Sequence, residues 1–352
     1  MDNFWKGKRV LITGHTGFKG AYLSLMLREL GAEIHGLSLP PEFNPNIYDL
    51  ATKGIYITEA LIDLREPHAV GEYVQSVRPE ITFHLAAQAS VLEGYRDPLK
   101  TWTTNVIGTL NLIESLMALE TPSSIVVATT DKVYLNSGEG KSFVEENQLG
   151  GGDPYSASKV AVEELIYSYR HVFDARNAML RMAVARAGNV IGGGDWMPNR
   201  IIPDALKAID TNQKLFVRNP NSTRPWQHVL DALYGYLLLA EKLSTSQEKI
   251  FESAFNFSNP ENDGIAVIEL LGLFPPNLEL SVEIESNSEA EYEAENLSLN
   301  SDKAQALLLW RPILGISEAI KLIIDWHLAY KNGQDMKQLT QSQIVKYLKN
   351  VN

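Results

Sequence analysis

Residues 9–20 read Arg9-Val10-Leu11-Ile12-Thr13-Gly14-His15-Thr16-Gly17-Phe18-Lys19-Gly20, a short apolar run that leads directly into three glycines spaced three apart. A helical pattern begins at Ala21. Strand, glycine turn and helix in this order let the backbone approach a pyrophosphate, which then rests on the positive end of the helix. The stretch therefore predicts a dinucleotide-binding unit. The residues that we assign to cofactor binding are Gly14, Thr16, Gly17, Phe18, Lys19 and Gly20.

Further apolar, β-branched runs alternate with helical patterns of ten or more residues. The expected strands lie at 33–38, 60–65, 81–87, 124–128 and 178–185, and a long helix is expected over 102–119. This alternation predicts an α/β fold of the Rossmann type, with a doubly wound parallel sheet.

The pattern also predicts the division of the chain into domains. We expect residues 1–186, rejoined by about 229–257, to form the dinucleotide-binding domain. A smaller α+β substrate domain is expected from 187–228 and 258–330, followed by a loosely held helical tail over 331–352.

The second strand carries information about the cofactor. An acidic residue is expected near its end to hold the ribose hydroxyls, but Ser38 is followed by Leu39 and Pro40. No arginine follows to bind a 2′-phosphate, which favours NAD over NADP without settling the choice. Asp63 could accept a hydrogen bond from an adenine amino group or could equally cap a helix. His84 is interpreted as a core histidine rather than a catalyst.

A cluster of reactive side chains follows the buried run at 124–128. The sequence continues with Thr130-Asp131-Lys132, at what would be the carboxyl edge of the sheet, where open parallel sheets bind their ligands. Tyr155 and Lys159 are four residues apart, which places them on one face of a helix. A phenol titrates near pH ~10, and a neighbouring ammonium favours its charged form. This pattern predicts an active site, although Tyr and Lys four apart also occur on exposed helices.

The composition of the 352-residue chain is that of a globular protein, with 45% apolar residues and a formal net charge of −12. A polyanion would be repelled overall, so nucleic acid and anionic membranes are not expected as partners. With no cysteine and seven scattered histidines, neither a disulfide nor a metal site is expected. No apolar run approaches the roughly 20 residues that cross a bilayer, and the first one is too short for a signal peptide. We expect a cytoplasmic protein.

Basic side chains in the second half could anchor a diphosphate, because guanidinium groups match phosphate oxygens. The candidates are Arg200, Arg218 and Arg224.

Taken together, the glycine spacing, Thr130, the Tyr155–Lys159 pair and Asn189 resemble the extended short-chain dehydrogenase/reductases that act on nucleotide sugars. Among these, Thr130-Asp131-Lys132 is similar to the CDP-glucose 4,6-dehydratases. The loops that match the same enzymes are 149–155, 187–196 and 224–229.

The resemblance implies NAD as the cofactor and a nucleotide sugar as the substrate. The further cofactor contacts that it implies come from Asp63, Leu64, Leu85, Ala86, Ala87, Thr104, Tyr155 and Lys159. The substrate contacts that it implies come from Gln88, Asn189, Arg200, Arg224 and His228. It also implies a homodimer or homotetramer, formed through the helices at 102–119 and 155–173, and a role in deoxyhexose synthesis for a surface polysaccharide.

The resemblance further implies a mechanism. Tyr155, as a phenolate, takes the proton of the sugar 4-hydroxyl while C4 gives up a hydride; Lys159 lowers the pKa of Tyr155 and holds the nicotinamide ribose. Thr130 orients O4. Asp131 protonates the departing C6 hydroxyl and Lys132 is the candidate base at C5, although it must first lose its own proton and a water could serve instead. Hydride return to C6 gives a 4-keto-6-deoxy sugar.

Two other interpretations remain open. A nucleotide-sugar 4-epimerase would share Tyr155 and Lys159 but would not need Asp131 and Lys132, which could then be a structural ion pair. A regulator that binds the dinucleotide without catalysis is the second. Leu92 stands where the dehydratases usually have an arginine, which leaves the substrate and its nucleotide open.

Overall fold

The computed structural model of the protein describes residues 3–136, 138, 140–176, 179–262, 264–284 and 297–351. Ala178, where the strand expected at 178–185 begins, lies outside the described residues.

Seven parallel strands form the central sheet, in the order β3-β2-β1-β4-β5-β6-β11. Their bounds are β1 (Arg9–Thr13), β2 (Glu33–Ser38), β3 (Thr58–Leu61), β4 (Ile81–His84), β5 (Ser123–Ala128), β6 (Leu180–Ala187) and β11 (Ala254–Phe257). The predicted doubly wound α/β fold is confirmed. The strand order reverses between β1 and β4, and a crevice forms beyond the carboxyl ends of strands at such a point.

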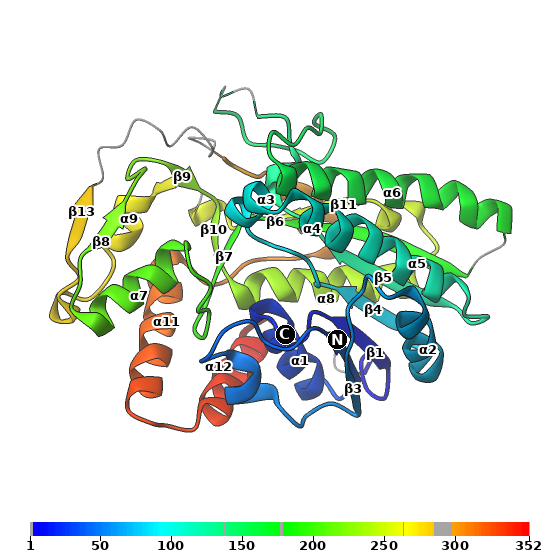
Figure 1. The fold of residues 1–352 in the computed structure, drawn as a ribbon, viewed down its shortest axis with the longest axis horizontal. Coiled ribbons are helices and arrows are strands. Elements are labelled where there is room, and N and C mark those ends of the chain that lie inside the picture. Colours follow the sequence, from blue (N-terminus) through cyan, green and yellow to red (C-terminus); the bar gives the residue numbers. More distant parts are fainter. Residues whose placement is uncertain are drawn as a thin grey trace.

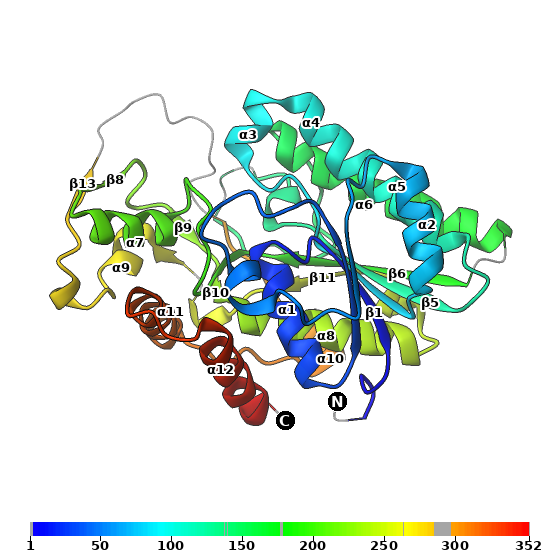
Figure 2. The ribbon, with the colours of Figure 1, turned by 60° about the horizontal axis from the view of Figure 1, so that its bottom comes forward.

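Helices cover both faces of this sheet (Figure 2). On one face lie α1 (Phe18–Glu29), α8 (Val229–Thr245), α10 (Asp302–Leu308) and α12 (Met336–Val351). On the other face lie α2 (Pro67–Val77), α5 (Gly108–Met117) and α6 (Pro154–Arg176), with the short α3 (Val91–Arg96) and α4 (Pro98–Trp102) packed against α6.

The alternation of side chains along each strand builds two cores. In β5, Ile125 and Val127 join the core under α2, α5 and α6, whereas Val126 and Ala128 join the core under α1 and α8. Because both faces are covered, the strand is continuously apolar from Ile125 to Ala128 rather than alternating with polar residues.

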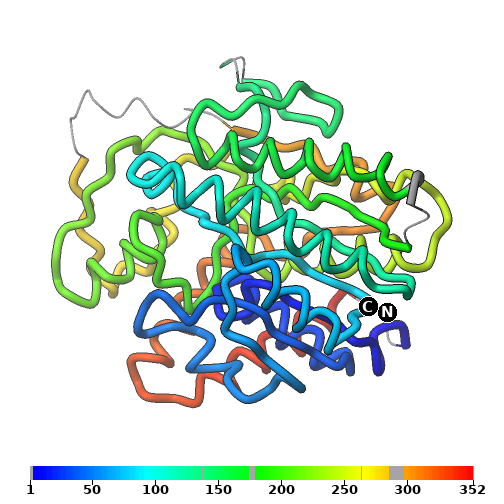
Figure 3. Tube along the Cα trace, turned by 45° about the vertical axis from the view of Figure 1, so that its right-hand side comes forward, coloured from blue at the N-terminus to red at the C-terminus, as the bar shows by residue number. Residues whose placement is uncertain are grey.

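A second region lies beside the sheet, to the left in Figure 1, and has a separate apolar core. Its strands are β7 (Asn189–Ile191), β8 (Leu215–Val217), β9 (Thr223–Arg224), β10 (Trp226–His228), β12 (Ile265–Ala266) and β13 (Val282–Ile284), which pair two by two. Its helices are α7 (Ile201–Thr211), α9 (Val267–Leu271) and α11 (Ile316–Lys331). The tube in Figure 3 shows that residues near 200 and near 270 meet here.

Single helical turns connect these elements. They are η1 (Tyr48–Thr52), η2 (Thr103–Ile107), η3 (Asp131–Val133), η4 (Lys249–Glu252), η5 (Pro260–Asn262) and η6 (Pro276–Leu278). Within the described ranges, no helix is both long and apolar enough to cross a membrane.

The structure corrects four expectations. The strand expected at 60–65 is β3, which ends at Leu61, and the helix expected at 102–119 begins at Pro98 and contains the π-helical turn η2. The segment 302–314 packs against α8 and β11 instead of joining the second region. The tail is not loosely held, because α12 buries Ile344, Tyr347 and Leu348 in the main core. The polar sequence of α12 does not reveal the narrow apolar face that packs against η1, α11 and α1.

Candidate active site

The glycine turn after β1 fits a dinucleotide. A Cβ on Gly20 would lie 2.1 Å from the carbonyl oxygen of Gly14, and a Cβ on Gly14 would lie 2.7 Å from the amide nitrogen of Ala86. Gly14 also has a φ of +74°, which favours glycine. The Thr16 hydroxyl is hydrogen-bonded to Ser38 at the end of β2 (2.8 Å), which fixes the turn. The first turn of α1 therefore presents its backbone N–H groups at the crevice, as a pyrophosphate requires.

The other residues expected to contact the cofactor differ in their burial and in their distance along the chain from the glycine turn. Leu85, Ala86 and Ala87 follow β4 directly and are half-buried at the crevice. Thr104 is half-buried in η2, and Leu64 is buried in the core beneath α5.

Asp63 is held by a neighbour. Its Oδ2 accepts a hydrogen bond from Nη2 of Arg65 at 2.6 Å, and this bond lowers the pKa of Asp63. An adenine amino group would have to share the carboxylate with that guanidinium. The alternative of a helix cap is wrong, since Glu66 is the N-cap residue of α2.

The turn η3 carries the acid at the end of β5. The Thr130 hydroxyl donates to Oδ1 of Asp131 (2.8 Å) and accepts from the backbone N–H of Lys132 (3.3 Å). Asp131 is 1% exposed, and its Oδ2 has no partner among the described residues. The Lys132 ammonium lies 3.5 Å from Oδ1. The turn thus offers a substrate one free carboxylate oxygen and one adjacent cation.

Tyr155 and Lys159 project from the first turns of α6 towards this turn. The Tyr155 and Thr130 side chains share a hydrogen bond. Burial raises the pKa of Tyr155 to about 12, and the Thr130 hydrogen bond and the charge of Arg200 oppose the shift. This is opposite to the lowering that we expected, because burial is the largest effect on Tyr155. The ammonium of Lys159 donates to the carbonyl oxygen of Ala128 (3.2 Å). Burial also lowers the pKa of Lys159 to about 8.

A buried ion pair between Glu163 and Arg186 lies behind Lys159 and was not predicted from the sequence. Glu163, one helical turn further along α6, accepts hydrogen bonds from Thr129 (2.7 Å) and from the guanidinium of Arg186 on β6. Its charge opposes the lowering of the Lys159 pKa. The acid four residues after Lys159 was the only signal in the sequence, whereas Arg186 is 23 residues away from Glu163.

Two basic side chains, Arg200 and Lys19, bring positive charge close to Tyr155 and Asp131. Arg200 donates to Asp195 (3.1 Å) and is 37% exposed at its side chain. Lys19, in the first turn of α1, is partly buried beside the ring of Tyr236 on α8, 6.0 Å from the ring centre. Nothing in the apolar pattern of α8 marked Tyr236 in the sequence.

The expected substrate residues divide into two groups. Asn189 and Arg200 are half-buried, at the start of β7 and directly before α7, and Arg224 is buried at β9, where it donates to the carbonyl oxygen of Thr223. Gln88 is engaged within the protein, since its amide donates to Ser90 and Thr101 (both 2.9 Å).

His228 is fully buried at the start of α8. Its Nδ1 accepts from the backbone N–H of Leu230 (3.3 Å), and burial lowers its pKa to about 3. It therefore caps the helix as a neutral ring. Its Nε2 is buried and has no partner among the described residues, and its assignment to substrate binding stays a prediction. His84 is likewise a core residue, as expected, hydrogen-bonded to Thr13 and Thr109.

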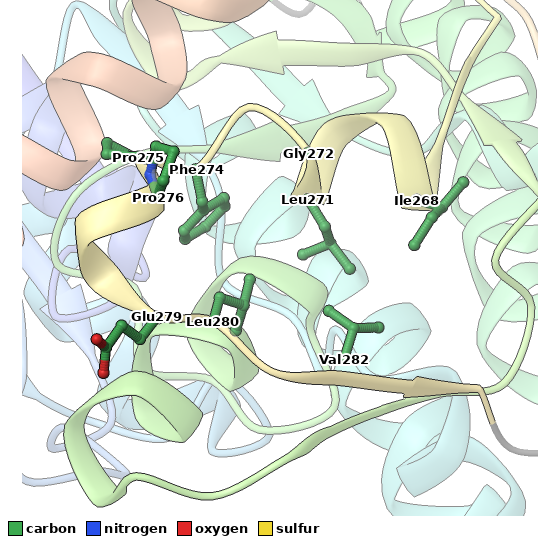
Figure 4. A pocket seen from close by; sticks show the side chains of 9 residues that line it. All are labelled: Ile268, Leu271, Gly272, Phe274, Pro275, Pro276, Glu279, Leu280 and Val282. Carbon is green, nitrogen blue, oxygen red and sulfur yellow. The ribbon is translucent and has the colours of Figure 1, made fainter.

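An apolar groove of about 370 Å³ lies elsewhere, between α9, η6 and β13. Figure 4 shows the side chains of Leu271, Phe274, Leu280 and Val282 around this groove, with the carboxylate of Glu279 turned outward. Since these residues offer no acid, base or cation to the interior, we do not consider the groove a catalytic site. The described residues contain no cluster of three or more potential metal ligands.

Comparison with known proteins agrees with this geometry. The model of the NAD dependent epimerase/dehydratase family matches residues 10–254. The chain is 36% identical to the CDP-glucose 4,6-dehydratase of Salmonella typhimurium, over 98% of both chains. It is 27% identical to the UDP-glucose 4-epimerase of Mycoplasma genitalium, over 78% of this chain and 84% of that protein.

Among solved structures, the UDP-glucose 4-epimerase of Thermus thermophilus in complex with NAD is similar, with a TM-score of 0.77, 25% identity, and coverage of 91% of this chain and 98% of that one. The family model and the glycine turn agree on NAD as the cofactor. The protein is a nucleotide-sugar dehydratase or epimerase, a member of the NAD dependent epimerase/dehydratase family.

Proposed function

We propose that the protein catalyses the NAD-dependent 4,6-dehydration of CDP-glucose to CDP-4-keto-6-deoxyglucose. The observation that carries the proposal is Asp131, a buried carboxylate with a free oxygen, held beside Lys132 and within one hydrogen bond of Thr130. Oxidation and reduction at C4 alone would not need an acid and a second amine there. The similarity over the whole chain to a CDP-glucose 4,6-dehydratase supports the same choice.

The first half of the reaction belongs to Tyr155 and Lys159. Tyr155 removes the proton of the sugar 4-hydroxyl, and Thr130 orients that oxygen. When bound, NAD would supply the hydride acceptor for C4 and the hydride for C6, and its positive charge would favour the phenolate that burial alone disfavours. Lys159 holds the nicotinamide ribose and adds positive charge near the phenol.

The second half belongs to η3. The 4-ketone makes the C5 proton acidic, and Asp131 protonates the departing C6 hydroxyl, so that water leaves across C5 and C6. Lys132 is the residue that we assign to C5. An ammonium cannot accept a proton, so the proton of Lys132 must first pass to Asp131, which leaves the neutral amine as the base and the neutral carboxyl group as the acid. Because the hydride that leaves C4 is added at C6, each turnover consumes no external oxidant or reductant.

The nucleotide sugar would lie between the sheet and the second core. Asn189 begins β7 and Arg200 directly precedes α7, and the guanidinium of Arg200 matches the charge of a diphosphate. We propose that the two cores mark a cofactor domain and a substrate domain on either side of that ligand.

We also propose that the protein self-associates through the helices around α4 and α6. The apolar side chains that this surface leaves exposed are Leu99 (74%), Trp102 (39%), Ile107 (44%) and Tyr167 (60%). Such a patch is typical of an interface between subunits. Size-exclusion chromatography with light scattering should give a dimer or tetramer, and a monomer at micromolar concentration would contradict this part.

The reaction is tested by incubating the purified protein with NAD and CDP-glucose, UDP-glucose or dTDP-glucose, and by identifying products by mass spectrometry and NMR. A CDP-sugar lighter by one water, with a C4 ketone and a C6 methyl group, supports the proposal. A mixture of 4-epimers with no loss of water would show an epimerase instead. Binding of NAD with no turnover of any of the three sugars would favour the non-catalytic interpretation.

A further inference from the structure

A buried histidine that the proposed reaction does not use is hydrogen-bonded on both sides of its ring. His84, the last residue of β4, is 3% exposed. Its Nδ1 lies 2.7 Å from the hydroxyl of Thr13, the last residue of β1, and its Nε2 lies 2.8 Å from the hydroxyl of Thr109 on α5. Both threonines are buried, so bulk water does not compete for these hydrogen bonds.

The hydroxyl protons decide which ring nitrogen carries the proton. Thr109 donates its only hydroxyl proton to the backbone carbonyl oxygen of Asn105 (2.5 Å), so the Thr109 oxygen accepts from His84, which is therefore protonated on Nε2. Burial lowers the pKa of His84 to about 3, so the ring is neutral and its Nδ1 accepts from the hydroxyl of Thr13. Thr13 in turn accepts from the backbone N–H of Ala86 (3.3 Å). The bonds from Ala86 to Asn105 thus form a chain in which every donor points the same way, and such bonds strengthen one another.

The first end of this chain lies against the glycine turn. Thr13 directly precedes Gly14, and its backbone carbonyl oxygen accepts from the N–H of Leu85 (3.1 Å). The amide nitrogen of Ala86 would lie 2.7 Å from a Cβ on Gly14, so the two backbone segments are in direct contact. The bond from Ala86 to the Thr13 hydroxyl therefore fixes the glycine turn against the end of β4.

The other end of the chain is the π-helical turn η2, which holds α6. The side-chain amide of Asn105 donates to the hydroxyl of Ser158 (2.8 Å), and Ser158 donates to the backbone carbonyl oxygen of Tyr155 (2.7 Å). The same amide group also pairs with the backbone of Gln88, since it accepts from the N–H (2.8 Å) and donates to the carbonyl oxygen (3.1 Å). Asn105 and Ser158 are buried, and Ser158 lies between Tyr155 and Lys159 in the sequence. The position of η2 therefore sets the position of the first turns of α6.

We propose that His84 is a positioning residue for hydride transfer: as a neutral ring protonated on Nε2, it fixes the glycine turn relative to the first turns of α6, which carry Tyr155 and Lys159. The reacting atoms of such a step must lie about 3–3.5 Å apart, and a displacement of about 1 Å costs about a hundredfold in rate. This role rests on the proposed function, since the step that it serves is the oxidation of the sugar by NAD.

The first experiment removes single hydroxyl groups from the chain. With CDP-glucose and NAD, Thr13→Val and Thr109→Val should each lower kcat on the order of tenfold and leave the KM of the sugar within about twofold, because the geometry of the reacting groups is disturbed rather than the binding of the sugar. Thr109→Ser keeps the hydroxyl and should restore kcat. Thr82→Val is the matched control: Thr82 lies on the same strand as His84, is fully buried, and its hydroxyl has no partner among the described residues. It should leave kcat unchanged.

The second experiment needs no sugar. Thr13→Val and Ser158→Ala change the two ends of the chain, and these two side chains share no hydrogen bond in the part of the chain that the structure describes. Calorimetry gives the dissociation constant of NAD for each single variant and for the double variant. The two effects should be non-additive by about fivefold, whereas Thr82→Val and Ser158→Ala should be additive within about twofold.

The third experiment observes the ring directly. In ¹⁵N NMR spectra of histidine-labelled protein, the signals of His84 are those that disappear in His84→Gln. They should show a neutral ring protonated on Nε2 throughout pH 5.5 to 8.5. A ring protonated on Nδ1, or one that becomes charged in this range, would overturn the inference, and this measurement decides even if the valine variants do not fold.

The outcomes separate the positioning role from a structural one and from the proposed function. Valine variants that are less stable in urea but keep the wild-type kcat would overturn the inference and leave His84 with a structural role alone. Additive effects on NAD binding would overturn it as well. Non-additive NAD binding in a protein that turns over none of the three nucleotide sugars would reject the proposed function and leave the connection between the glycine turn and α6 in place.

Discussion

Replacing Glu163 by glutamine should shift the pH dependence of the reaction. The carboxylate lies one helical turn beyond Lys159 and opposes the lowering of its pKa. Side chains four residues apart on a helix lie roughly 6 Å apart, and at an effective dielectric constant near 20 two unit charges at that distance interact by about 3 kcal/mol, which is about two pKa units. Since Arg186 already neutralises part of the Glu163 charge, we expect a shift of about one unit.

The direction of the shift follows from the charge. Lys159 is protonated below its pKa of about 8, and activity that needs its ammonium falls as the pH rises through this value. Without the Glu163 carboxylate the pKa of Lys159 falls further, so the alkaline limb of the kcat profile should move about one unit towards lower pH. The assay is product formation from CDP-glucose and NAD between pH 5.5 and 9.5.

The substitution also tests the ion pair as a structural element. The side chains of Glu163 and Arg186 are 6% and 4% exposed, and removing one partner of a buried pair costs about 3–5 kcal/mol. Glutamine keeps one acceptor oxygen, so we expect about 3 kcal/mol, measured by urea unfolding. Glu164→Gln, on the exposed side of the same helix, is the matched control. It should change neither the free energy of unfolding nor the position of the alkaline limb. A destabilised Glu163→Gln protein with an unmoved alkaline limb would refute the electrostatic argument and leave only the structural role.

Four further outcomes are expected. Tyr155→Phe removes the hydroxyl used in hydride transfer and should reduce kcat at least a thousandfold while NAD binding, measured by calorimetry, is retained; a rate near wild type would exclude the assigned role. Asp131→Asn should spare oxidation at C4 and slow elimination, so that a trapped 4-keto-glucose species or NADH accumulates in rapid-quench or absorbance experiments; an unchanged rate would refute this. Gly20→Ala places a Cβ 2.1 Å from a carbonyl oxygen of the same turn and should abolish NAD binding or folding, as calorimetry and circular dichroism would report. Tyr347→Phe removes a buried 2.8 Å hydrogen bond to Asp231, which should lower the unfolding free energy by about 1–3 kcal/mol in urea; no loss would mean that α12 docks through its apolar face alone.

The sequence by itself determined the sheet, the cofactor turn and the position of Tyr155 relative to Lys159. Each of these depends on spacing within a few residues, which backbone geometry converts directly into a strand, a turn or a helix face. The same locality explains why the boundaries of β3 and of the helix before η2 were misjudged by a few residues.

Only the tertiary structure decided which charges interact in the site and which polar side chains are buried or paired. The Glu163–Arg186 pair joins α6 to β6, and the fields of Lys159 and Arg200 reach Lys19 from distant segments. His228, which the resemblance assigns to the substrate, also caps α8 through its Nδ1. Whether a charge is solvated, paired or buried depends on what the rest of the chain packs around it, and no local spacing encodes that.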